Sequence, residues 1–94
     1  MPNDDNRDQF VAVRSMFVSG SVKRMRDIEK LYPTAIAKSL RINHSRYIQK
    51  LYKPGEFSMK QLGELANLLD VNIQVILDVV IKQMNSPVKV SKKK

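Results

Sequence analysis

The hydrophobic residues of this chain recur at helical spacing in short segments that are separated by turn signals. Apolar side chains at positions i, i+3 and i+4 predict amphipathic helices. The pattern is interrupted at residues 19–21, at Pro33, at residues 53–57 and at residues 70–72. The sequence therefore predicts one all-α unit of five or six short helices. We expect these helices over residues 8–18, 24–32, 34–41, 44–52, 58–69 and 73–84.

The first of these segments admits two interpretations. Phe10, Val13 and Phe17 recur at helical spacing, but residues 10–13 and 16–18 are also rich in side chains that favour β-strands. We favour a helix, because Asp8 then lies near the positive end of the helix dipole. The seven residues before Asp8 are polar, so we expect a disordered start. Residues 1–21 then form this start and an extra helix.

Capping residues indicate where the later helices begin. Thr34, Asn43 and Asn72 each precede an apolar segment and are expected to be N-caps. Ser58 is followed three residues later by Gln61, which is the pattern of a capping box. The helix over residues 24–32 should end at Pro33, because the residue before proline is driven out of the α region.

Composition excludes several kinds of site. With 94 residues and no cysteine, the chain has one modest core and neither disulfides nor thiolate ligands. Its one histidine, His44, makes a zinc site improbable. The three glycines form no phosphate-binding loop and no Ser/His/Asp set has a context for catalysis. We therefore expect a non-enzyme with no metal, no cofactor and no small-molecule ligand.

Charge points to a polyanionic partner. Seventeen Lys and Arg residues against nine Asp and Glu residues give a net charge of +8. Residues 21–60 carry +7 of this charge, whereas residues 61–84 carry −2. A basic block of this kind indicates a binding face. The basic end, residues 85–94, is expected to be a disordered tail. The chain shows no secretion signal and no apolar run that would span a bilayer, so we expect a cytoplasmic protein with no membrane partner.

Two consecutive segments satisfy the requirements of a helix-turn-helix motif. Residues 34–41 and 44–52 are short amphipathic helices joined by a tight turn, and Ala37 is small enough for a close crossing. On a helical wheel the inward side of the second helix is Ile48, Leu51 and Tyr52. Its outward side then holds Arg46, Gln49, Lys50 and Lys53, which suit base edges and phosphates.

Residues 22–84 resemble the lambda-repressor-like (Cro/repressor, XRE-type) helix-turn-helix domain. The resemblance is carried by residues 35–43 and 45–51 for the two motif helices, and by residues 62–71 for the family's fourth helix and the turn after it. It implies a five-helix bundle, here with an extra N-terminal helix, that binds double-stranded DNA. The function implied is that of a bacterial or phage-type transcriptional regulator with helix 44–52 in the major groove.

The resemblance also assigns roles to single residues. Thr34 and Lys38 would contact phosphates, and Lys53 and Lys60 would hold the flanking backbone. The major-groove residues would lie at the start and on the outer face of the second motif helix. The complete DNA-binding set is Thr34, Lys38, Asn43, His44, Ser45, Arg46, Gln49, Lys50, Lys53 and Lys60.

Two features depart from the family pattern. Arg41 occupies a turn position where the family often has glycine, at a cost of about 1 kcal/mol if the backbone adopts a positive φ. The inward residue of the second motif helix is either Ile48, with one extra turn residue, or Tyr47, with the usual spacing and Lys50 turned inward. We favour Ile48.

The last helix raises the question of a homodimer. Its inward stripe is expected to be Ile73, Ile76, Leu77, Val80, Ile81 and Met84, which leaves Val75 and Val79 outside it. These two valines either form a two-fold dimer contact or are covered by the N-terminal helix of the same chain. The principal alternative function is a helical protein-interaction module, such as an adaptor or antitoxin-like subunit. RNA binding is a weaker alternative, because the outward face lacks aromatic platforms.

Overall fold

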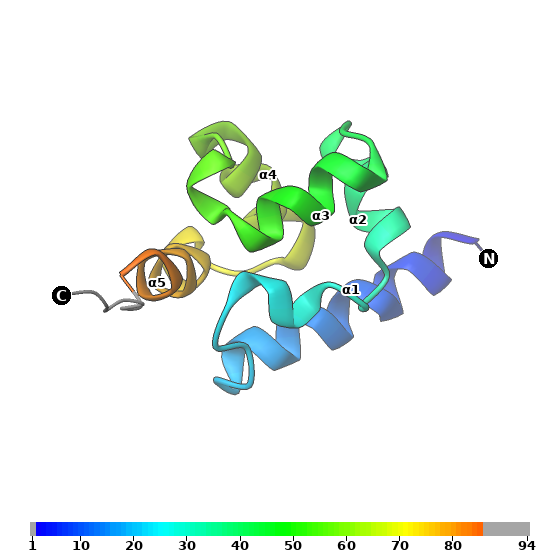
Figure 1. The fold of residues 1–94 in the computed structure, drawn as a ribbon. Helices are drawn as coiled ribbons and strands as arrows, with labels where there is room; N and C mark the ends of the chain where they lie inside the picture. Colours follow the sequence, from blue (N-terminus) through cyan, green and yellow to red (C-terminus); the bar gives the residue numbers. More distant parts are fainter. Residues whose placement is uncertain (1, 86–94) are drawn as a thin grey trace, which may run out of the picture.

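The computed structural model describes residues 2–85, with side chains from Phe10 onward. Over this range the chain forms five α-helices and two short 3-10 helices and contains no strand (Figure 1). The prediction of an all-α fold is therefore confirmed for these residues, whereas residues 86–94 of the tail expected over residues 85–94 lie outside them. The elements are α1 (Pro2–Val18), η1 (Met25–Ile28), α2 (Pro33–Leu40), α3 (His44–Tyr52), η2 (Pro54–Glu56), α4 (Met59–Leu69) and α5 (Ile73–Met84).

Helix α1 is longer than the sequence predicted. It begins at Pro2 instead of Asp8, so the expectation of a disordered start is wrong for residues 2–7. Proline is well suited to the first position of a helix, because the N–H that it lacks would have no partner there. Val13 and Phe17 of α1 are buried. The helix packs against α4 and α5, and its N-terminal end projects beyond the other helices (Figure 1).

The helix predicted over residues 24–32 is only the short 3-10 helix η1. The Asp27 carboxylate accepts hydrogen bonds from the backbone N–H groups of Lys23 and Arg24, at 2.9 and 3.0 Å, and so closes a tight turn. Tyr32 then adopts a left-handed backbone with φ of 52°. Because a left-handed residue cannot continue a right-handed helix, the segment ends before Pro33.

Helix α2 begins at Pro33, with Tyr32 rather than Thr34 at its N-cap position. The prediction that Thr34 caps this helix is therefore wrong. Proline at the first helical position fixes φ in the helical range, so Thr34 becomes the second helical residue. Ile36, Ala37 and Leu40 form the buried face of α2.

A three-residue turn joins α2 to α3. Arg41 adopts a left-handed backbone with φ of 63°, at the position where the sequence predicted that glycine would be favoured. The next N–H, that of Ile42, donates to the Ala37 carbonyl at 3.1 Å. Asn43 then caps α3, because its side-chain oxygen accepts from the Arg46 N–H at 2.8 Å. The predicted cap and bounds of α3 are confirmed.

The inward face of α3 differs from the one we favoured. Tyr47 and Leu51 are fully buried, whereas Ile48 is half-buried and Tyr52 is 47% exposed. The correct register is therefore the alternative with Tyr47 inward and no extra turn residue. Tyr47 and Leu51 are separated by one helical turn, so both lie on the side of α3 that packs against the core.

Capping chemistry predicted the starts of the last two helices correctly. Ser58 and Gln61 form both hydrogen bonds of a capping box at α4, each at 3.0 Å. Asn72 accepts from the Gln74 N–H at 2.8 Å at the start of α5. Between the two helices, Asp70 adopts a left-handed backbone with φ of 58° that ends α4.

Helix α5 buries part of the predicted stripe, Ile76 and Val80, together with Val79, which was expected to lie outside it. Ile76, Val79 and Val80 lie in the core, with Val79 only 9% exposed. Ile81 and Met84, which we expected to face inward, are 49% and 59% exposed. Because α1 packs against α5 and supplies the buried Phe17, the core contacts α5 along the Val79 side instead.

The side-chain amide of Gln83 joins three elements. Its Oε1 accepts from the Met25 N–H of η1 at 2.7 Å, and its Nε2 donates to the Leu51 carbonyl of α3 at 3.1 Å. Backbone groups at helix ends need such partners when they are partly buried. None of the helices within residues 2–85 is both long and apolar enough to cross a bilayer.

Candidate nucleic-acid interface

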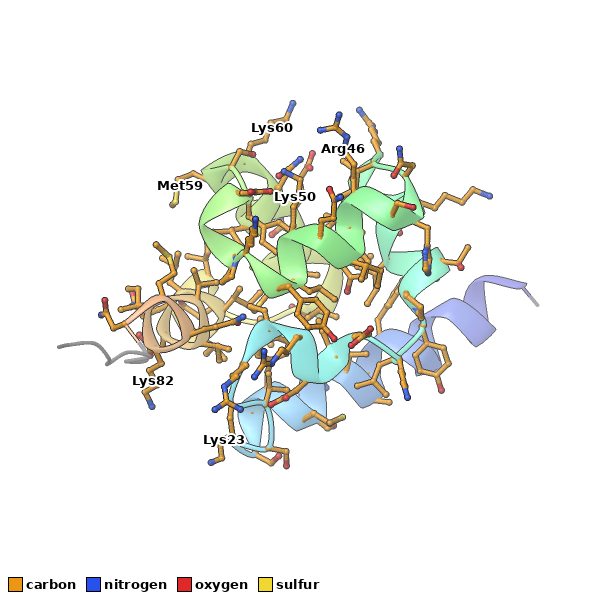
Figure 2. The ribbon with its side chains drawn as sticks, viewed as in Figure 1. Lys23, Arg46, Lys50, Met59, Lys60 and Lys82 are labelled. Carbon is orange, nitrogen blue, oxygen red and sulfur yellow. The ribbon has the colours of Figure 1, made fainter. Side chains whose placement is uncertain are left out.

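The outer face of α3 carries the predicted groove residues at its start and along one side. His44, Ser45, Arg46 and Gln49 are all exposed, while the opposite side of the helix holds the buried Tyr47 and Leu51. Arg46 and Gln49 are three residues apart, so they lie on the same side of the helix. Figure 2 shows Arg46 directed away from the body of the molecule, toward the same side as Lys60.

Asn43 supports the outer face of α3 by binding a backbone N–H group at the start of the helix. Its side chain is exposed, yet the oxygen already accepts a hydrogen bond from Arg46. This bond fixes where α3 begins and therefore the direction in which His44 and Ser45 lie. Helix α3 therefore begins at His44, as predicted.

Lys50 does not share the outer face of Arg46 and Gln49, so that expectation is wrong. Its side chain is half-buried, and the Nζ atom donates to the Glu56 carbonyl at 2.8 Å. The same nitrogen lies 6.0 Å from the centroid of the buried Phe57 ring, within the range of a cation–π contact. Lys50 therefore holds η2 against α3, which follows from the inward turn of Tyr47.

Other basic side chains flank α3. Lys38 of α2, Lys53 at the end of α3 and Lys60 of α4 are exposed, as is Thr34 near the start of α2. Arg41 in the turn is also exposed and was not among the predicted site residues. The sequence contained a signal for it, because Arg41 is a cation in the turn between the two motif helices.

The basic residues around α3 form no ion pair with an acid in the part of the chain whose side chains are described. The single ion pair there joins Arg14 of α1 to Asp70, with an N–O distance of 3.3 Å. An uncompensated basic face attracts polyanions over distances of about a Debye length, roughly 8–10 Å.

The C-terminal end of α3 rests on η1 and the residue after it. The Tyr52 hydroxyl donates to the Glu29 carboxylate, and the Arg26 guanidinium lies 5.7 Å from the Tyr52 ring centroid. The hydrogen bond to Glu29 raises the pKa of Tyr52, because that bond needs the protonated phenol. Together with Gln83, these contacts orient the end of the helix.

Tyr47 anchors the middle of α3 in the core but buries a hydroxyl group without a hydrogen bond among the described residues. Its ring is fully buried, and its hydroxyl has no hydrogen-bond partner among the described residues. Burial raises the pKa of Tyr47 well above its usual value, because the phenolate would lose its hydration. The side chain thus acts as packing and cannot contact a ligand at the surface.

The two valines proposed for a dimer contact lie beside α1. Val79 is buried, and Val75 is half-buried. They line a shallow hollow of about 450 Å³ together with Phe17, Val18 and Val22. This arrangement favours the interpretation in which the N-terminal helix covers the valines within one chain, and Val79 is not available to a second copy.

Nothing in the described part of the chain resembles a metal centre, since no three His, Cys, Asp or Glu side chains gather there. Comparison of the chain with protein-family models, with curated proteins and with solved structures finds no match.

Proposed function

We propose that α2 and α3 form a helix-turn-helix motif of the lambda-repressor-like type and that the protein binds double-stranded DNA as a transcriptional regulator. In this proposal α3 enters the major groove, with Arg46 and Gln49 as the principal readers of base edges. Arginine pairs well with guanine and glutamine with adenine in that groove. The resemblance of residues 22–84 to that family supports the same assignment.

The observation that carries the proposal is the division of α3 into two sides. Tyr47 and Leu51 anchor the helix in the core, while His44, Ser45, Arg46 and Gln49 stand in solvent at its start and along its outer side. A recognition helix requires this combination, because its first turns must approach base edges while the body holds it rigid.

Phosphate contacts come from the surrounding elements. Lys38, Arg41, Lys53 and Lys60 approach from α2, the turn, the end of α3 and α4, so they would hold the backbone on both sides of the groove. Contacts of this kind set affinity and its dependence on salt but carry no sequence information.

Binding to labelled duplex DNA, followed by fluorescence anisotropy, tests the proposal. About four to five phosphate contacts predict a slope of log K against log salt near −4, which is roughly a 100- to 500-fold loss of affinity between 50 and 200 mM salt. Selection from random duplexes should then return a preferred site. Arg46→Ala and Gln49→Ala should each relax the preference at one base pair, by about 1–3 kcal/mol.

The matched control is Lys23→Ala, because Lys23 is an exposed cation on the opposite side of the molecule (Figure 2). It should leave the selected site unchanged. If no duplex binds, or if Arg46→Ala and Gln49→Ala select the same site as the parent, the proposal is wrong. Absence of DNA binding together with capture of a protein ligand on α3 would favour the interaction module, and tighter binding of RNA than of duplex DNA would favour an RNA-binding protein.

A further inference from the structure

A shallow hollow lies between the C-terminal end of α1 and one side of α5. Its floor is formed by Phe17, Val22 and Val79, which are buried in the core. Its sides are formed in part by Val18 and Val75. The volume of about 450 Å³ lies at the lower end of the range of roughly 300–1,000 Å³ that ligand pockets occupy. This α1–α5 hollow is therefore large enough for one or two side chains of a ligand.

Two apolar side chains in the α1–α5 hollow are open to solvent. Val18, in the last turn of α1, is 69% exposed, which is the highest fraction among the large hydrophobic residues whose side chains are described. Val75 of α5 is half-buried. An apolar ligand would release the water in contact with these two valines, and that release lowers the free energy. The hollow therefore offers an apolar contact that the fold itself leaves unused.

Two lysines border the hollow, and neither has an ion-pair partner among the described side chains. Lys23, in the segment before η1, and Lys82, in the last turn of α5, are both exposed. Figure 2 shows both side chains on the lower side of the molecule, away from Arg46. The carboxylate that lines the hollow, Asp78, already accepts a hydrogen bond from the Gln74 Nε2 at 2.9 Å. The charges that remain for a ligand are therefore positive.

We propose that the α1–α5 hollow binds an acidic segment of a partner protein. In this arrangement a large apolar side chain of the segment lies between Val18 and Val75 and buries both. The carboxylates on either side of it pair with Lys23 and Lys82. A segment with apolar residues between acidic ones thus complements both the apolar and the charged part of the hollow.

Charge and apolar contact together select this occupant. A second copy of the chain is less suited to the hollow, because each copy carries a net charge of +8 and the two repel one another. Duplex DNA supplies phosphates for the lysines, but its charged backbone has no apolar side chain to cover Val18 and Val75. An acidic protein segment supplies both kinds of group.

The α1–α5 hollow lies away from the proposed DNA interface. In Figure 2, Arg46 and Lys60 point to the upper side of the molecule, whereas Lys23 and Lys82 point to the lower side. A segment held in the hollow therefore leaves the outer side of α3 uncovered. The inference goes beyond the proposed function and does not depend on it, because it concerns a second surface and a second class of partner.

Two synthetic peptides test the hollow with the full chain and without DNA. The probe is a fluorescein-labelled hexapeptide with a central leucine and phenylalanine between aspartate and glutamate residues, and its binding is followed by fluorescence anisotropy. One short segment buries less than the roughly 1,200–2,000 Å² of a stable interface, so we expect a Kd of about 10 μM to 1 mM in low salt. The comparison peptide has serine at the two central positions and the same charge. It should bind roughly tenfold more weakly or less tightly still, because it has no large apolar side chain to bury.

Charge reversal tests the two lysines. Lys23→Glu combined with Lys82→Glu should weaken binding of the probe by roughly tenfold or more, because carboxylates then face carboxylates. The matched control is Arg46→Glu combined with Lys60→Glu, which changes the net charge equally on the other side of the molecule (Figure 2). The control should bind the probe like the parent. Circular dichroism verifies that each variant is folded.

A second pair of variants tests the apolar contact. Val18→Ser should weaken binding of the probe by roughly three- to tenfold, because the segment then loses an apolar neighbour. Val11→Ser is the control, since Val11 is also an exposed valine of α1 but does not line the hollow. It should leave binding of the probe unchanged.

The inference is overturned if the probe does not bind at a protein concentration of about 1 mM, or if the serine peptide binds as tightly as the probe. It is also overturned if the two charge variants behave alike or if Val18→Ser and Val11→Ser behave alike. Binding to vesicles of phosphatidylglycerol that is tighter than binding to the probe and is lost in Val18→Ser overturns it as well, because the occupant is then a lipid surface. Since no DNA is present, a protein that binds the probe but no duplex contradicts the proposed function alone.

Discussion

Removal of one buried oxygen should make this protein more stable. The Tyr47 hydroxyl is inaccessible to solvent and has no partner within the described residues, so folding strips it of water without replacing the lost hydrogen bonds. An unsatisfied buried polar group of this kind costs about 1–3 kcal/mol. Tyr47→Phe keeps the ring, with its packing, and deletes only the hydroxyl.

The expected gain is smaller than the full cost, because the oxygen also makes van der Waals contacts that phenylalanine leaves empty. Each such contact between two heavy atoms is worth about 0.1–0.2 kcal/mol, so we expect a net stabilisation of about 1 kcal/mol. For a chain of this size that corresponds to a rise in Tm of about 4–8 °C. Thermal unfolding followed by circular dichroism at pH 7 measures both quantities.

A dependence on pH distinguishes this explanation from a general packing effect. Burial raises the pKa of Tyr47 in the folded state above its value in the unfolded chain. The folded state therefore holds the Tyr47 proton more tightly than the unfolded chain does. As a result, the free energy of unfolding does not depend on this group below about pH 10 and falls as the pH rises above it. The parent should lose stability relative to Tyr47→Phe above pH 10, by up to about 1.4 kcal/mol per pH unit.

The refuting result is a destabilisation at neutral pH. If Tyr47→Phe lowers the free energy of unfolding by 1 kcal/mol or more, the hydroxyl has a hydrogen-bond partner, such as an ordered water. A difference between the two proteins that stays constant from pH 7 to pH 11 would contradict the burial of the phenol.

Three further substitutions follow from contacts around α3. Gln83→Ala should lower the free energy of unfolding by about 1–3 kcal/mol in denaturant titration, because the Met25 N–H and the Leu51 carbonyl lose their partner. The control, Gln74→Ala on the exposed side of α5, should lower it by less than about 0.5 kcal/mol. Arg41→Gly should stabilise the protein by about 0.5–1 kcal/mol, since glycine tolerates a φ of 63°. It should also reduce the slope of log K against log salt for DNA binding by about one unit, and an unchanged slope would show that Arg41 is not in the interface. Lys50→Gln should weaken binding to every duplex alike without changing the selected site, because Lys50 donates to the Glu56 carbonyl. A changed base preference would show that Lys50 contacts bases in the major groove.

Local chemistry made much of the fold predictable. The capping box of Ser58 and Gln61 and the caps at Asn43 and Asn72 depend on residues within three positions of one another, so the sequence contains the whole interaction. The bounds of α3 and α5 followed from these caps and from the apolar periodicity.

Errors arose where distant parts of the chain decide the outcome. Periodicity could not distinguish Ile48 from Tyr47 as the inward residue, because both lie near the apolar side of α3, and packing against other helices selected Tyr47. The orientation of Lys50 followed from that choice. The exposure of Ile81 and Met84 likewise depends on where α1 contacts α5, which the pattern of α5 alone does not contain.

The 3-10 helix η1 shows a different limit. Residues 24–32 have helical periodicity, yet the Asp27 carboxylate binds backbone N–H groups before it, and the left-handed Tyr32 ends the segment. A side chain and a helix carbonyl compete for the same backbone N–H groups within a few residues. Which of them binds depends on whether the rest of the fold packs against a full helical turn. Here Met25 and Ile28 are both buried by the short form.

Hydrogen exchange at the Met25 amide should measure the docking of α5. Its acceptor, Gln83, is 58 positions away along the chain, so this bond requires α5 to be docked against η1. It opens only when α5 leaves. In a native-state hydrogen-exchange experiment, the Met25 amide should therefore exchange with the free energy of α5 detachment, and its neighbours Arg24 and Asp27, whose bonds are local, should exchange much faster.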